Sequence, residues 1–155
     1  MNKKKVLSAI ICLSLILNVV LGIMLYRQNT QYDFLRQQAD KSFQDHFSSL
    51  VSHLTTACPE DESEYMIWVQ DAKHLSYLCL NAFNLSSYEG NHTLQDIILI
   101  LRSIALTWEE YPIGLIPREL AADLLELSYR VTDDEELLTK VYEALDQLWD
   151  EHRLQ

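Results

Sequence analysis

The feature that most constrains this chain is an uncharged apolar segment near its N-terminus. The 21 residues from Val6 to Tyr26 contain no charged side chain, and Lys3, Lys4 and Lys5 come directly before them. At a helical rise of about 1.5 Å per residue, this length can cross a hydrocarbon core of about 30 Å. The sequence therefore predicts a transmembrane signal-anchor helix over residues 6–26, preceded by a short cytoplasmic N-terminus of residues 1–5.

The orientation of the predicted span follows from the charges at its two ends. Three lysines precede the span and only Arg27 follows it directly, so the positive-inside bias predicts a single-pass protein of the cell membrane with an extracytoplasmic C-terminal domain. A cleaved secretory signal has a shorter apolar core of roughly 7 to 15 residues and a small-x-small cleavage site. No Ala-x-Ala occurs here, which favours an uncleaved anchor; a secreted helical protein is the alternative.

Small and polar residues recur on one face of the predicted span. Ser14, Asn18 and Gly22 are spaced every fourth residue, a pattern that brings two transmembrane helices together in some proteins. These three residues are a candidate dimer seam. The alternative is that a few such residues are simply tolerated in a single-pass helix.

Charge is distributed very unevenly along the chain. All 23 acidic residues lie after Arg27, where only 8 basic residues remain, so this part carries a net charge of −15. Such a domain repels phosphate backbones, which argues against nucleic-acid binding. Basic proteins or cations are the charged partners that it favours.

The composition of the exported part is typical of an all-α protein. Hydrophobic residues make up 48% of the chain, with only 3 Gly and 3 Pro, which suits long helices. Phe43, Phe47, Leu50 and Leu54 follow the helical spacing of four, three and four. We expect a membrane-proximal helix or stalk over residues 27–56, with Tyr32, Leu35 and Ala39 extending its apolar stripe toward the membrane.

Residues 57–155 are predicted to form an acidic bundle that packs with this proximal helix, giving about four to five helices in all. Helix boundaries are expected near Pro59 and Phe83, Thr93 and Glu110, Pro117 and Tyr129, and Asp134 and Arg153. Thr93 and Thr132 each open a sequence resembling a capping box. The short connection between the last two helices predicts an antiparallel pair.

No residue pattern names a reaction. Cys58 and Cys79 lie at the ends of a predicted helical stretch of roughly 25 Å, too far apart for a disulfide. The five histidines lack the i, i+4 spacing of helical zinc sites, so we expect neither metal nor cofactor. No nucleophile motif occurs, and we expect no enzyme. Asn84 and Asn91 begin tripeptides of the N-glycosylation type.

These observations favour a membrane-anchored interaction or scaffold module that binds a protein partner or a second copy of itself. The rival hypothesis is a small-ligand-binding protein or enzyme with a pocket between helices. Its walls would be the loop Asn84 to His92 and the connector Tyr111 to Pro117. The enzyme or ligand-binding hypothesis requires a pocket with convergent polar groups, whereas the interaction module requires an exposed apolar surface.

Overall fold

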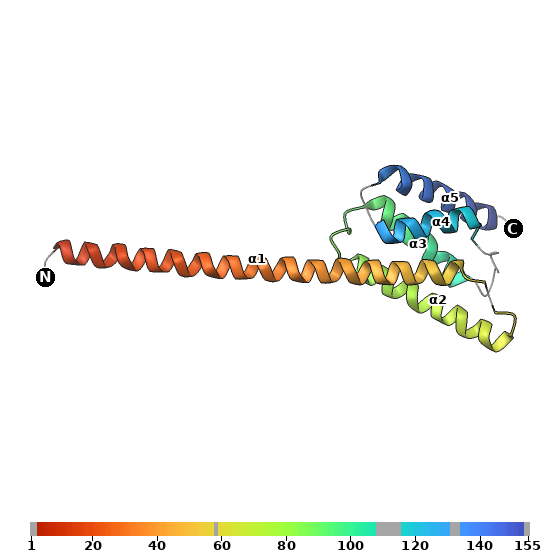
Figure 1. The fold of residues 1–155 in the computed structure, drawn as a ribbon, viewed down its shortest axis with the longest axis horizontal. Helices are drawn as coiled ribbons and strands as arrows, with labels where there is room; N and C mark the ends of the chain where they lie inside the picture. The colour runs from red at the N-terminus through yellow and green to blue at the C-terminus, as the bar shows by residue number, and fades with distance from the viewer. Residues whose placement is uncertain (1–2, 58, 108–115, 131–133, 154–155) are drawn as a thin grey trace. The chain divides into compact units, whose positions relative to one another are not determined.

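The computed structural model describes the backbone of residues 3–57, 59–107, 116–130 and 134–153, and the side chains of residues 13–57, 59–107, 116–129 and 134–151. The predicted all-α class is confirmed for these residues, which contain five helices and no strand (Figure 1). The helices are α1 (Lys3–Thr55), α2 (Glu62–Phe83), α3 (His92–Thr107), α4 (Arg118–Arg130) and α5 (Glu135–Arg153).

The chain divides into two compact units, Met1–Gln37 and Gln38–Gln155. Helix α1 contributes to both units, because it runs without a break from Lys3 to Thr55 and so passes the division after Gln37. The polar residues 28–30 do not interrupt this helix. In the part of the chain with described side chains, no helix has a stretch long and apolar enough to cross a membrane. Residues 6–12 of the predicted span lie outside that part.

The second unit is organised around the C-terminal part of α1. Phe43, Phe47, Leu50 and Leu54 are fully buried, which confirms the predicted stripe. The ring of Phe43 stacks on Phe47 with centroids 5.6 Å apart and meets the edge of Phe83 from α2 at 5.5 Å. Helix α2 packs on α3, and α3 packs on α5, which in turn packs on α4. The antiparallel course of α4 and α5 agrees with the prediction (Figure 1).

The residues that extend this stripe toward the N-terminus are not buried. Tyr32 and Leu35 are 64% and 60% exposed, and Ala39 is half-buried. Tyr32 and Leu35 belong to the first unit, in which α1 is the only described element. Periodicity predicts which residues share a face, but it does not say whether another element covers that face.

Helix α2 begins at Glu62, three residues after the boundary expected near Pro59. The Asp61 carboxylate accepts hydrogen bonds from the backbone N–H groups of Ser63 (2.9 Å) and Glu64 (3.1 Å) and from the Ser63 hydroxyl. These bonds, the hydroxyl bond first, hold the pKa of Asp61 below its ordinary value. The buried face of α2 includes Ser76, whose hydroxyl donates to the carbonyl of Lys73 at 2.7 Å.

The predicted capping residues of the later helices are corrected. Asn91, not Thr93, caps α3, because its side-chain oxygen accepts from the backbone N–H of Leu94 at 3.0 Å. Asp134 caps α5 in the same way, accepting from Leu137 at 3.0 Å, while Thr132 lies outside the described residues. An Asn or Asp side chain reaches the third helical amide, so it competes well with a neighbouring Thr for this position.

Two phenylalanines of α1 give a matched test of this core. Replacing the fully buried Phe47 by Ala should lower the free energy of unfolding by about 3 to 5 kcal/mol, because a cavity remains. Replacing Phe34 by Ala, at a position that is 59% exposed on the same helix, should change the free energy of unfolding by less than about 0.5 kcal/mol. Urea unfolding of the full chain in detergent micelles, followed by tryptophan fluorescence, measures both. Equal effects of the two variants would contradict this core.

Candidate interaction surfaces

The largest exposed apolar surface lies on the N-terminal part of α1. Between positions 13 and 26, eleven large hydrophobic side chains are 45% to 74% exposed: Leu13, Leu15, Ile16, Leu17, Val19, Val20, Leu21, Ile23, Met24, Leu25 and Tyr26. Monomeric soluble proteins rarely expose contiguous apolar patches larger than a few hundred Å². We call residues 13–26 the apolar segment of α1; a surface of this kind requires a lipid or protein cover.

The candidate seam lies within this apolar segment. Ser14, Asn18 and Gly22 are all exposed, on one face of α1. A Cβ atom added to Gly22 would meet no other atom within 4 Å, so no close contact within the chain requires glycine there. The seam stays a prediction about a contact with another molecule.

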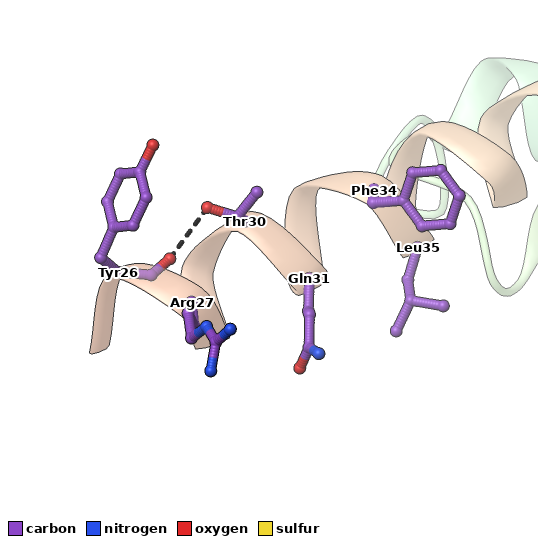
Figure 2. Close-up of a pocket in the computed structure, with 6 residues that line it drawn as sticks. All are labelled: Tyr26, Arg27, Thr30, Gln31, Phe34 and Leu35. Carbon is purple, nitrogen blue, oxygen red and sulfur yellow. Dashed lines mark hydrogen bonds between the residues drawn. The ribbon is translucent and has the colours of Figure 1, made fainter. Parts of the chain in front are cut away.

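A shallow hollow of about 850 Å³ follows on the same helix. Figure 2 shows its six lining residues, Tyr26, Arg27, Thr30, Gln31, Phe34 and Leu35. The Thr30 hydroxyl donates to the carbonyl of Tyr26 at 2.9 Å, so its donor is already used. Because every lining residue comes from one helix, the hollow cannot enclose a small molecule by itself.

A smaller hollow of about 330 Å³ lies between α4 and α5, and we call it the α4–α5 groove. Pro117, Leu120, Ala144 and Leu148 supply its apolar surface. Its polar residues are Glu119, Asp123, Lys140, Gln147 and Glu151.

The polar border of the α4–α5 groove is dominated by carboxylates. Lys140 Nζ lies 2.8 Å from Asp123 Oδ2. Its hydrogen bond to Asp123 and the charge of that carboxylate raise the pKa of Lys140, and Glu119 and Glu126 add to the effect. The ammonium group of Lys140 thus already interacts favourably with these carboxylates.

The two predicted pocket walls are described only in part. Pro117 lines the α4–α5 groove, whereas residues 111–115 of the connector lie outside the described residues. The loop Asn84 to His92 does not line the groove. It is tied to α1 instead: Ser87 donates from its backbone N–H (2.6 Å) and hydroxyl (2.9 Å) to the Asp40 carboxylate. Gln44 also donates to the Tyr88 hydroxyl at 3.2 Å.

The histidines of α1 have structural partners. His53 Nε2 donates to the carbonyl of Trp68 at 2.8 Å, and the two rings stack with centroids 4.7 Å apart. His46 Nδ1 donates to the carbonyl of Ser42 at 2.6 Å. Both histidines are half-buried. Among the described side chains, no three His, Cys, Asp or Glu residues converge as metal ligands.

The two asparagines of the glycosylation-type tripeptides differ in their environment. Asn84 is exposed just after the end of α2. Asn91 is half-buried, and its side chain caps α3. Of the two, Asn84 is the more accessible to a modifying enzyme.

Comparison with known proteins provides no further constraint, since no family model, curated protein or solved structure matches the chain.

The thiol of Cys79 gives a prediction for alkaline pH. Cys79 is fully buried, and burial raises the pKa of its thiol from 9.0 to about 12. The unfolded thiol therefore ionises first, and the stability contributed by the neutral thiol is present below pH 9 and lost as pH rises toward 12. Between pH 9 and 10.5 the chain should lose about 1 to 2 kcal/mol more than its Cys79→Ala variant.

Urea titrations of both chains across this pH range measure the difference. Tyrosine and lysine ionisation affects both chains equally and cancels. Identical pH profiles would contradict a buried, neutral Cys79.

Proposed function

We propose that this chain is a single-pass membrane protein whose helical bundle lies outside the cytoplasm and acts as an interaction or scaffold module. The observation that carries the proposal is the apolar segment of α1. Lipid is the cover that fits it best, because its apolar side chains surround the helix. Leu15, Ile16 and Leu17 are consecutive, as are Val19, Val20 and Leu21, so they project in different directions. A single protein partner would cover only one side.

The sequence around this segment supports the anchor. The proposed span covers residues 6–26, and the structure describes the side chains of residues 13–26 only. Residues 6–12, which complete the span, contain no charged side chain. The three lysines at positions 3–5, against the single Arg27 directly after the span, support the proposed orientation.

The charge of the bundle supports a binding role and indicates the chemistry of the partner. Helices α4 and α5 together contain nine acidic and four basic residues. The α4–α5 groove places Leu120, Ala144 and Leu148 beside Glu119 and Glu151. A protein segment with an apolar anchor residue flanked by Lys or Arg would match both features. We propose that such a basic segment binds in this groove.

The rival function, a small-ligand-binding protein or enzyme, would use the same groove. Its volume of about 330 Å³ lies at the lower end of small-molecule sites. Its polar groups are mainly carboxylates, and its one lysine is already paired with Asp123. This arrangement favours a cationic protein partner over an enclosed ligand. The secreted alternative remains open, and N-terminal sequencing of the mature protein distinguishes it.

Charged substitutions test the anchor. The double variant Ile16→Lys and Val19→Lys places two charges near the centre of the proposed span, at a cost of about 2.5 to 3.5 kcal/mol each. Most of this protein should leave the membrane pellet after an alkaline carbonate wash, whereas the unaltered chain stays. The matched control is Leu85→Lys with Tyr129→Lys, two side chains of the bundle that are 75% and 77% exposed. The control should pellet like the unaltered chain.

An unaltered chain that already washes off the membrane would contradict the anchor. Orientation is read separately with a membrane-impermeant maleimide on intact cells, in a chain with Cys12→Ser and Cys58→Ser and the buried Cys79 retained. A cysteine at exposed Gln70 should be labelled, and one at Asn2 should not. The reverse pattern would contradict the proposed topology.

Site-specific photocrosslinking tests the partner surface. A photoreactive residue at Gln147, in the α4–α5 groove, should give a discrete crosslinked product in living cells. Adding Glu119→Lys and Glu151→Lys should reduce this product at least fivefold, because two attractions to a cationic partner become repulsions.

The control places the same photoreactive residue at Gln70 on the exposed side of α2, where no such product is expected. Charge reversal at Glu62 and Glu64, exposed in the first turn of α2, should leave the Gln147 product unchanged. Absence of a product at Gln147, or equal sensitivity to both reversals, would argue against the groove as the binding surface.

A further inference from the structure

A second regularity in α1 concerns the residues just beyond the proposed span. Between Arg27 and Lys41 only four residues are apolar, and three of them, Tyr32, Leu35 and Ala39, are separated by three and four positions. Continuing this alternation toward the N-terminus defines a stripe that we call the α1 seam. It consists of Ser14, Asn18, Leu21, Leu25, Gln28, Tyr32, Leu35 and Ala39.

The α1 seam has the period of a coiled coil. An average spacing of 3.5 residues keeps one face of a helix directed at a partner helix under a left-handed supercoil. Over residues 27–41, three of the four seam positions are apolar, and each of the other six heptad phases places at most two apolar residues there. One side of α1 is therefore distinguished beyond the proposed span, whereas within the span apolar residues lie on all sides.

This face has no cover in the structure. Leu21, Leu25, Tyr32 and Leu35 are 48% to 66% exposed. Lipid would cover the first two, but Tyr32 and Leu35 lie beyond the proposed span and face water. In Figure 2, Leu35 projects from the helix beside the hollow described above.

The seam has a clear C-terminal limit. The next positions of its heptad spacing, Ser42, His46 and Ser49, are polar and not buried. In a straight α-helix, however, Leu50 lies five full turns after Tyr32, so the buried residues of the second unit continue the same side of α1. Along the helix, Leu21 to Leu35 belong to the first unit and the buried residues to the second.

Charge indicates which partner fits the seam. No seam position is charged, and residues 27–41 contain three basic and two acidic residues, in contrast to the acidic bundle. A cationic partner would be attracted to the bundle rather than to this segment. A second copy meets no like-charge pair at the seam border, because in a parallel pair Arg36 of one copy lies near Gln31 of the other.

The seam is long enough for a dimer of membrane-confined chains. Its 26 residues extend about 39 Å. A strip of this length and about 10 Å wide on both copies covers on the order of 800 Å² in plan, and interdigitated side chains increase the buried accessible area toward the roughly 1,200 to 2,000 Å² of stable interfaces. A shared membrane also holds both copies in one orientation at a high effective concentration.

We infer that two copies of this chain pair in parallel through their α1 helices along the α1 seam, with Asn18 facing its counterpart. An Asn at such a position fixes the register of a coiled coil, and within the membrane its amide can donate to the partner's amide. The parallel arrangement rests on the proposed function, which gives both copies the same orientation.

This geometry differs from packing through Ser14, Asn18 and Gly22 alone. Both arrangements contain Ser14 and Asn18, but the α1 seam continues through Leu21 and Leu25 and leaves Gly22 at its border. A Gly22→Leu substitution would block close packing through Gly22. It should leave the α1 seam dimer intact.

A cysteine scan of the full chain in membranes tests the inference. The background carries Cys12→Ser and Cys58→Ser and keeps the buried Cys79. Single cysteines replace the seam residues Gln28, Tyr32 and Leu35 and the off-seam residues Thr30, Asp33 and Gln37. After mild oxidation, the seam positions should give at least fivefold more disulfide-linked dimer than the off-seam positions. Uniform crosslinking, no crosslinking, or a maximum off the seam would overturn the inference.

Two adjacent apolar residues provide the matched control, with the cysteine at Gln28 as the reporter. Leu35→Asp, on the seam, should reduce the dimer about tenfold, because it places two carboxylates against each other. Phe34→Asp, of similar exposure but off the seam, should leave it unchanged, as should Gly22→Leu. Equal losses from Leu35→Asp and Phe34→Asp, or loss of the dimer with Gly22→Leu, would contradict the α1 seam.

The same membranes separate this inference from the proposed function. Chains that resist the alkaline wash but lack the seam pattern would overturn the dimer and leave the anchor standing. Chains that wash off, yet crosslink in the seam pattern in solution, would overturn the anchor and leave the pairing of α1 helices standing.

Discussion

The bundle depends on the burial of one face of α1 between Phe43 and Leu54. Phe43 contacts Phe47 on its own helix and Phe83 on α2, and all three rings are fully buried. Asp40 and Gln44, at the N-terminal end of this face, bind Ser87 and Tyr88 of the loop between α2 and α3. The helix that contains the apolar segment is thus also part of the core, so any force on the proposed anchor acts on a helix that the bundle itself requires.

Helix α1 presents different surfaces at different points along its length. Its residues are apolar on all sides in the apolar segment, on one side near Tyr32 and Leu35, and on a buried stripe from Phe43 onward. Each pattern suits a different environment: lipid, a second helix and the interior of the bundle. Anchoring and pairing are proposals for the first two patterns, and burial is observed for the third.

Electrostatics separates the two proposed interactions. The α4–α5 groove is bordered by carboxylates that raise the pKa of Lys140, so it favours cationic groups. The α1 seam is uncharged and favours another apolar helix. In a parallel pair the two acidic bundles lie at the same end of the dimer, so their like charge opposes the pairing and the α1 seam has to outweigh this repulsion.

The sequence by itself determined the features that depend on local chemistry. The helical class, the approximate boundaries of α2, α4 and α5, and the buried stripe of Phe43, Phe47, Leu50 and Leu54 follow from residue spacing and type. The cap of α3 was misplaced by two residues, because Asn91 and Thr93 are both plausible caps and only the hydrogen bond to Leu94 distinguishes them.

Only the tertiary structure decided which surfaces are covered. It showed that Tyr32 and Leu35 are exposed although their stripe continues toward buried residues, and that the loop after α2 is hydrogen-bonded to α1 through Ser87 and Asp40. It also showed that the groove lies between α4 and α5, with Pro117 as the one described residue of the predicted connector wall that lines it. The physical reason is that spacing along the chain fixes the face on which a side chain lies, whereas burial depends on another segment packing against that face.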